Sequence, residues 1–282
     1  VAISTALIKD SYEGKEMSKV LSVTQAFMLI APMLAPVLGA IILKVADWKM
    51  TFIVLAILTG VSLVGAFLLQ ETLPVKERTQ SSTIQTILGL RKVAKNPNFS
   101  SLLLVGALIA APFMAYLALA SYIYIDGFGV SETTFSMYFA LNAGASILGP
   151  VMYMRFGAGS VKKVISAGIM VAIISAILIL TIGNASPIIF LLSYVLYSIM
   201  TSYFRPLISD LLLSATKTDV GATSSVMNFG FTVIGSIGMV VGSLQWSSYT
   251  GGLGITMLIF IALTTAVWFY LLKARSIQFD WK

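Results

Sequence analysis

Long apolar stretches recur along this chain, separated by shorter polar segments. Each has about 20 or more mostly apolar residues, the length that a helix needs to cross the hydrocarbon core of a membrane. The apolar runs are continuous and do not alternate with polar residues, so the pattern predicts helices rather than the strands of a membrane barrel. We expect eight complete spans, at Met17–Leu43, Met50–Gln70, Leu102–Ile125, Thr133–Tyr153, Val164–Ile182, Pro187–Leu213, Gly221–Leu244 and Gly251–Leu272, and a stub at Val1–Ile8 that is too short to cross.

One connector is far longer than the others and divides the chain. It runs from Glu71 to Ser100, and Ile84, Ile87 and Leu88 form a short apolar face within it. We interpret this part as a helix on the membrane surface, with a plain solvated linker as the alternative. Six spans after a long polar loop are typical of one half of a two-halved transporter. The predicted domains are residues 1–70, the remainder of a first bundle; 71–100, a central cytoplasmic loop; and 101–282, a six-helix bundle.

Positive charge is concentrated on alternate connectors. If the connectors are counted alternately from the stub onward, one set carries 15 of the 18 Lys and Arg residues, and the other carries only Lys44 and Lys49. The positive-inside rule therefore predicts that the first set is cytoplasmic, together with both ends of the complete carrier. In a membrane protein the net charge of +7 reflects this bias, so we expect no nucleic-acid partner.

The composition excludes several classes of protein. The chain is 58% hydrophobic and 10% charged, whereas a soluble domain averages about 45–50% and 25%. Cytosolic enzymes, secreted domains and disordered proteins do not fit. Cysteine and histidine are absent, which argues against a metal site or a cofactor. There is no phosphate-binding Gly-rich loop, which argues against ATP-driven transport. There is also no intramembrane carboxylate cluster and no repeated polar ring, which argues against a membrane enzyme and a channel.

The chain starts at Val1, inside an apolar segment. We therefore expect it to lack the first three spans and most of the fourth of a twelve-span carrier. A natural protein of eight spans with an unusual start is the alternative.

The first complete span contains two prolines, Pro32 and Pro36, on one helical face. Each removes a backbone hydrogen bond, so together they bend the helix, and Ala35, Gly39 and Ala40 permit close packing against a neighbouring helix. A generic kinked helix at a packing seam would have the same features. The segment resembles motif C of the proton-coupled drug exporters of the major facilitator superfamily, with alanine at three positions where that motif has glycine.

Further segments resemble the same superfamily. Leu69–Pro74 resembles the end of its sixth span, and Lys9-Asp10 the end of its fourth. Ala111–Ser121 with Phe135–Asn142 is similar to spans seven and eight of the bicyclomycin-resistance (Bcr/CflA) branch, and Gly221–Ser225 to the start of its span eleven. The resemblance implies an all-α integral membrane protein with a partial major facilitator fold. It also implies export of drugs or other small, mostly apolar compounds across the cytoplasmic membrane by proton antiport with alternating access. A carrier of the same fold for another metabolite and an inactive fragment are the alternatives.

A basic turn between two spans resembles motif A of this superfamily. Arg155, Lys162 and Lys163 lie there, and together with Asp10 they are the candidates for a cytoplasmic gate. Simple anchoring of helix ends by cations is the alternative.

Few polar residues lie inside the predicted spans. Arg205 is the only charged residue well within one, next to Pro206, and it either lines a cavity or snorkels to the cytoplasmic interface. No carboxylate lies near the centre of a span, so the proton-binding group is expected in the missing spans.

The remaining substrate-cavity candidates are aromatic, thioether and amide side chains, which suit bulky and mostly apolar compounds. Each of them also fits ordinary helix packing. They are Met114, Tyr116, Tyr138, Asn142, Met227 and Asn228. The expected partners are a drug-like molecule, protons and membrane lipids. Gly238 and Gly242 form a Gly-x-x-x-Gly pair that we interpret as packing within the chain, and we expect a monomer.

Overall fold

The fold is entirely helical over the residues that the structure describes. In this computed structural model they are residues 20, 35, 38–69, 83–156, 160–214 and 220–274, and no strand occurs among them. Seven of the described helical segments are long and apolar enough to cross a membrane. The predicted all-α membrane fold is therefore confirmed. The predicted span Met17–Leu43 lies largely outside the described residues, apart from a helical segment at 38–45.

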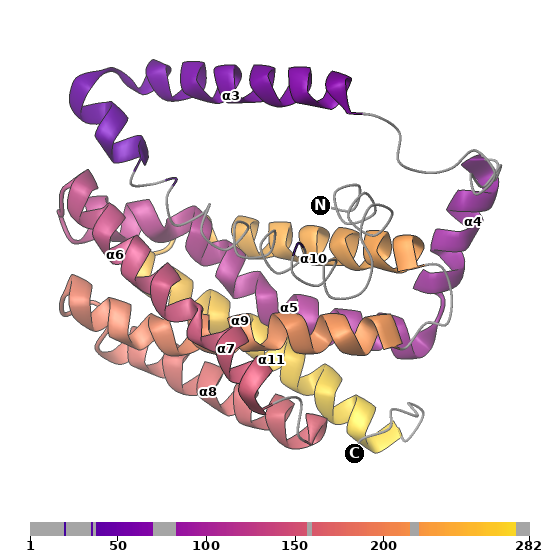
Figure 1. Cartoon of the computed structure of the whole chain (residues 1–282). Helices are drawn as coiled ribbons and strands as arrows, with labels where there is room; N and C mark the ends of the chain where they lie inside the picture. Colours follow the sequence, from indigo (N-terminus) through magenta and orange to yellow (C-terminus); the bar gives the residue numbers. More distant parts are fainter. Residues whose placement is uncertain are drawn as a thin grey trace.

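Each of the other predicted spans coincides with observed helix to within about five residues at each end (Figure 1). Apolar length alone therefore locates these spans. The helices are α3 (Trp48–Leu68), α4 (Thr83–Ala94), α5 (Pro97–Ser121), a π-helical continuation η2 (Tyr122–Gly127), α6 (Glu132–Ser146), α7 (Leu148–Phe156), α8 (Val161–Thr181), α9 (Pro187–Ser214), α10 (Val220–Gly242) and α11 (Tyr249–Ala274).

Local chemistry explains where α5 begins. The Oδ1 atom of Asn96 accepts hydrogen bonds from the backbone N–H groups of Asn98 and Phe99, at 3.0 and 3.4 Å. Pro97 occupies the first helical position, where its missing N–H costs nothing. These two residues form a strong helix start after the polar connector.

The predicted span Thr133–Tyr153 is not one continuous α-helix. It is divided at Ile147 into α6 and α7, because Pro150 has no N–H to donate to the carbonyl of Ser146. The N–H of Ile147 instead bonds to the carbonyl of Gly144 at 3.2 Å. Gly149 then lies directly against α9, where a Cβ atom would be 2.5 Å from the carbonyl oxygen of Ile199. The break and the glycine together bring α7 onto the α9 backbone.

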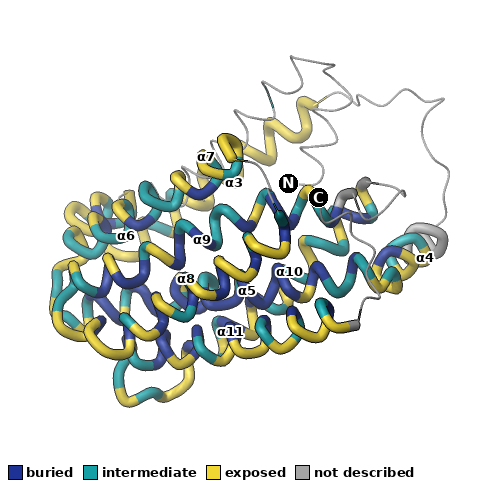
Figure 2. The backbone as a smooth tube through the Cα atoms, turned by 90° about the horizontal axis from the view of Figure 1, so that it is seen from below, coloured by how far each residue is buried: buried dark blue, intermediate teal, exposed yellow. Residues whose placement is uncertain are grey.

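Helix α5 forms the centre of the bundle and packs against α9, α10 and α11 (Figures 1 and 2). Helices α8 and α9 pack together, and α6 and α7 both lie along α9. The core between them contains large apolar side chains such as Phe99, Ile165 and Leu207, each at most 1% exposed.

The contact between α5 and α10 is made by glycines. A Cβ atom at Gly238 would lie 2.4 Å from the carbonyl oxygen of Ala111, and one at Gly242 would lie 3.0 Å from the Cβ of Ala115. These distances confirm that the Gly-x-x-x-Gly pair packs within the chain, because only residues without a side chain let the two backbones approach so closely.

Helix α3 stands apart from this bundle (Figure 1), and none of its residues is buried by the described part of the chain. Helix α4, by contrast, packs against α5 and α10, and its Val93 is buried. The long connector therefore contains a helix, as predicted, and its location on the membrane surface stays a prediction. Its apolar positions Ile84 and Ile87 have side chains outside the described set, while Leu88 is exposed.

Candidate functional site

Aromatic rings from four helical segments meet in one cluster, in which four rings are buried and three are half-buried. α5 contributes Tyr116, η2 contributes Tyr124, α6 contributes Phe135, Tyr138 and Phe139, and α9 contributes Phe190 and Tyr194. We call these seven residues the aromatic cluster. It joins helices that are far apart in sequence, and it brings together two of the predicted cavity residues, Tyr116 and Tyr138.

The rings in the aromatic cluster are stacked. Tyr116 lies on Tyr194 with ring centroids 4.0 Å apart and planes 21° apart, and on Phe139 at 5.9 Å and 4°. Tyr124 stacks on Tyr138 at 5.2 Å and 10°, and meets Phe190 edge-on at 5.4 Å. Such contacts stabilise the cluster beyond the burial of the rings.

Three hydroxyls of the cluster, and one amide oxygen beside it, are buried without a hydrogen-bond partner among the described residues. They are the Oη atoms of Tyr116, Tyr124 and Tyr194 and the Oδ1 atom of Asn142. A buried polar group that makes no hydrogen bond destabilises a fold by roughly 1–3 kcal/mol. Such groups accordingly mark places where a ligand with matching donors or acceptors gains affinity.

The structure separates the other predicted cavity residues. Asn142 is 3% exposed and lies on α6 one helical turn after Tyr138, which is half-buried. Met114 is half-buried and lies against Gly235 of α10, where a Cβ would be 2.9 Å from its Cγ.

Met227 is half-buried on α10 and packs on the core, whereas Asn228 beside it is exposed. Arg205 is also exposed, on α9. These two residues do not belong to the aromatic cluster, so the predicted set is divided between a buried part and an exposed part.

A hydrogen bond joins α7 to α9 at the end of the bundle that the charge bias predicts to be cytoplasmic. The Oη of Tyr153 donates to Oδ2 of Asp210 at 2.5 Å. The three basic gate candidates, Arg155, Lys162 and Lys163, are exposed near this end, and Asp10 lies outside the described residues. Their role in gating stays a prediction.

Motif C is described only in part. Pro32 and Pro36 lie outside the described residues. Ala35 is helical and exposed, Gly39 is half-buried with no atom within 4 Å of a Cβ built on it, and Ala40 is 8% exposed. The bend that the two prolines predict therefore stays a prediction.

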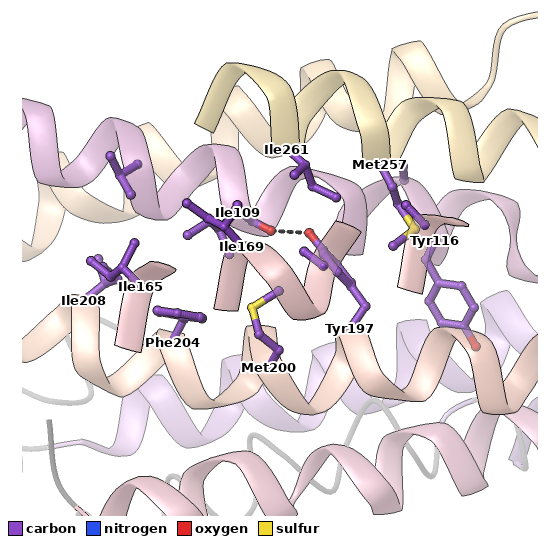
Figure 3. Close-up of a cluster of buried hydrophobic side chains, with 14 of the residues drawn as sticks. Ile109, Tyr116, Ile165, Ile169, Tyr197, Met200, Phe204, Ile208, Met257 and Ile261 are labelled. Carbon is purple, nitrogen blue, oxygen red and sulfur yellow. Dashed lines mark hydrogen bonds between the residues drawn. The ribbon is translucent and has the colours of Figure 1, made fainter. Parts of the chain in front are cut away.

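A second buried region surrounds Tyr197, where α5, α8, α9 and α11 meet around a small cavity (Figure 3). The hydroxyl of Tyr197 donates to the carbonyl of Ile109. Ile109 lies in the turn of α5 that precedes Pro112 and Phe113, where the proline interrupts the backbone hydrogen bonds of the helix. The hydroxyl of Thr264, also on the cavity wall, donates to the carbonyl of Phe260. Because both hydroxyls are satisfied and the rest of the wall is apolar, this region stabilises the bundle and offers a ligand no free polar group.

Comparison with known proteins adds the family. The model of the Major Facilitator Superfamily matches residues 1–239, most of the chain. The chain belongs to the Major Facilitator Superfamily. Together with the membrane-length helices, this makes it a multi-pass membrane protein.

Individual relatives in this superfamily are more distant. The "Uncharacterized MFS-type transporter YdgK" of Bacillus subtilis is 32% identical over 186 residues, which cover 64% of this chain and 46% of the relative. The "Multidrug resistance protein MdtM" of Salmonella typhimurium is 21% identical over 87% of this chain and 60% of its own length. The "Bicyclomycin resistance protein homolog" of Haemophilus influenzae is 28% identical over 55% of this chain and 39% of its own length. The chain thus spans about half the length of the curated relatives it matches.

Sequence reasoning missed most of the aromatic cluster in this Major Facilitator chain. One signal was available: Phe190, Tyr194 and Tyr197 recur at the i, i+4 and i+7 positions of one helix face. The contact of that face with Tyr116 and Tyr124 could not be predicted, because it depends on the relative register of α5 and α9.

Proposed function

We propose that this protein acts in the export of drugs or other small, mostly apolar compounds, as a secondary carrier of the bicyclomycin-resistance (Bcr/CflA) type. It exchanges the compound for protons by alternating access. Membership of a transporter superfamily supports carriage across a membrane rather than enzymatic chemistry. Relatives whose names include multidrug resistance and bicyclomycin resistance support drug-like substrates.

The observation that carries this proposal is the set of unsatisfied polar atoms among stacked rings. Tyr116, Tyr124, Tyr194 and Asn142 bury polar atoms without partners in the described part of the chain. Ligand pockets typically combine apolar and aromatic walls with a few polar groups that orient the ligand. Aromatic faces accept many flat apolar compounds, while the three hydroxyls and the amide select among them.

Proton exchange requires a titratable group within the membrane. In the described spans the carboxylates lie near helix ends, with Glu132 in the first turn of α6 and Asp210 one turn before the end of α9. We therefore place the proton-binding carboxylate outside the described residues. Lysine and arginine on alternate connectors support a location in the cytoplasmic membrane, with the basic connectors inside.

A transport assay on inside-out membrane vesicles tests the proposal. The complete gene is expressed in a bacterial strain without its major drug exporters, and a pH-sensitive dye reports the proton gradient across energised vesicles. Chloramphenicol or bicyclomycin is then added. If the protein exchanges drug for protons, either drug partly collapses the gradient, and vesicles from the same strain with an empty plasmid do not respond.

The assay also separates the alternatives. A gradient that ignores both drugs and a panel of aromatic anions, aromatic cations and neutral compounds would contradict drug export. A collapse caused by polar metabolites alone would favour a carrier of the same fold with a different cargo.

A further inference from the structure

Arg205 is the only charged residue that the described spans hold away from their ends. It lies on α9, nine residues before the end of the helix at Ser214, which is about 13 Å along the axis at 1.5 Å per residue. Its side chain is exposed. An exposed cation at this depth either faces lipid and snorkels to the cytoplasmic interface, or lines a polar cavity.

The neighbours of Arg205 on α9 favour the polar cavity. Helical spacing places Tyr194, Ser198, Thr201 and Arg205 on one face, and we call these four residues the polar stripe of α9. Tyr194 and Ser198 are fully buried, Thr201 is half-buried and Arg205 is exposed. The stripe therefore starts in the aromatic cluster and leaves the packed core at Arg205. Lipid-facing surfaces are apolar, so a polar stripe that becomes exposed favours a polar cavity over lipid at Arg205.

A second polar group lies beside this stripe on α6. Phe139, three residues before Asn142, stacks on the ring of Tyr116, and Tyr194 of α9 stacks on the same ring. Gly149, two turns after Asn142, lies against the carbonyl of Ile199. Asn142 is therefore level with the buried half of the stripe, and its buried Oδ1 is an acceptor that receives no hydrogen bond from any described residue.

Arg205 also lacks a counter-charge within the described part of the chain. Asp210 is the carboxylate closest to it along α9, but five residues of helix turn it about 140° away from Arg205. Its Oδ2 accepts the hydrogen bond of Tyr153 instead. The exposed end of the stripe thus holds a guanidinium without an anion, and its buried end holds aromatic rings.

We infer that the exported substrate carries an anionic group, such as a carboxylate or a sulfonate, that pairs with the guanidinium of Arg205. This inference rests on the proposed export function and narrows its substrate class to aromatic organic acids. The apolar rings of the substrate lie toward the aromatic cluster, and an N–H or O–H group donates to Asn142. Tyr194 and Arg205 are eleven residues apart, about 16 Å along the axis, a distance comparable to the length of an elongated molecule of two or three rings. Arginine suits this role because its planar fork pairs with both oxygens of an oxyanion.

A matched pair of fluorescent probes tests the charge requirement. Anilinonaphthalenesulfonate is the sulfonate of the uncharged phenylnaphthylamine, so the two differ only in the anion. Binding of each is titrated to the protein from its complete gene in lipid nanodiscs, with empty nanodiscs as background. The variants are Arg205→Gln, Arg205→Lys and, as the matched control, Lys273→Gln, which removes an exposed cation from the last turn of α11.

The expected result is a loss of sulfonate affinity that depends on the charge at position 205. Arg205→Gln raises the Kd for the sulfonate by about tenfold or more, because a charge-assisted pair is lost. Arg205→Lys has a smaller effect, and Lys273→Gln has none. The Kd for the uncharged probe changes less than about twofold in every variant, which shows that each variant is folded.

Three outcomes would overturn the inference. In the first, the wild-type protein binds the uncharged probe as tightly as the sulfonate. In the second, Arg205→Gln binds the sulfonate as tightly as the wild type does, the result expected if Arg205 snorkels to the interface. In the third, Arg205→Gln loses affinity for both probes equally. If the wild-type protein binds neither probe and exports no drug, the proposed function itself fails. If it exports neutral drugs but ignores the sulfonate, only this inference fails.

Discussion

Helices α3 and α5 are alike in sequence and opposite in packing. Both are long and strongly apolar around their whole circumference, and each is sufficient to cross a membrane. In α3 none of the most apolar window is buried, whereas 67% of the corresponding window of α5 is buried. Figure 2 shows the same contrast, with α3 exposed along its length and α5 dark in the centre of the bundle.

The comparison shows that apolar character places a helix in a membrane but does not decide where it packs. Lipid tails are as apolar as leucine, so association depends on close fit and on hydrogen bonds between helices. α5 has both: α10 contributes the glycine that lies against Ala111, and α9 donates the hydroxyl of Tyr197 to the carbonyl of Ile109. Within the described part of the chain, α3 has neither.

The largest effect is expected where a side chain is added to the contact between α5 and α10. Gly238→Ala should destabilise the protein by about 3 kcal/mol, because its Cβ would overlap backbone atoms of Ala111 that cannot move away cheaply. Thermal unfolding of the purified protein measures this. The control is Gly60→Ala on α3, where no atom lies within 4 Å. Equal losses in the two variants would contradict the difference between the helices.

Removing apolar volume should give a smaller difference in stability between variants of α5 and variants of α3. Leu102→Ala on α5 leaves a cavity at a residue that is 2% exposed, and should lower the free energy of unfolding by about 2 kcal/mol. Leu58→Ala on α3, where the leucine is 57% exposed, should change it by less than about 0.5 kcal/mol. The same unfolding assay applies. A loss at Leu58 as large as that at Leu102 would show that α3 is packed as tightly as α5.

The hydrogen bond from α9 to α5 should contribute less again. Tyr197→Phe keeps the ring and removes the hydroxyl that bonds to Ile109, so the expected loss is about 1 kcal/mol. Tyr270→Phe is the control, because that tyrosine is 70% exposed on α11. An unfolding temperature unchanged in both variants would mean that this bond does not hold the two helices together.

The smallest change in stability is expected in the aromatic cluster, where the effect on function should be larger. Tyr116→Phe removes a hydroxyl that has no partner in the described residues, so stability should be unchanged or slightly raised. Drug-driven collapse of the proton gradient should nevertheless weaken, since that hydroxyl orients the ligand in the proposed site. Full transport activity in this variant would remove Tyr116 from the site.

Replacement of the motif C prolines tests the part of the chain that the structure does not describe. Pro32→Ala with Pro36→Ala should straighten the first complete span and reduce transport more than insertion. Vesicle transport and the amount of protein in the membrane are measured together. Normal transport at a normal amount of protein would leave the two prolines without a function in the transport cycle.

Much of the fold could be predicted from the sequence because the signals are local. Continuous apolar length marks α8 and α9 to within a few residues. The division of α6 from α7 was missed, because apolar length alone does not reveal a lost backbone hydrogen bond. The pair Gly149 and Pro150 was a sequence signal for that break. Of the candidate site, Tyr116 and Tyr138 were predicted as cavity residues and lie in the same aromatic cluster, linked through Phe190 and Tyr124. Tyr124 and Tyr194 were missed because stacking depends on the register between helices.

The sequence by itself determined that this protein crosses a membrane several times, roughly where each span lies, and that alternate connectors carry the positive charge. Those properties follow from the free energy of moving single segments between water and lipid, which depends on composition and length. Only the tertiary structure decided which apolar helix is buried, which hydroxyls have partners, and that Arg205 is exposed at the end of a polar stripe. Such properties depend on contacts between helices that lie more than fifty residues apart in the chain, such as that of Tyr197 with Ile109, and no local pattern contains them.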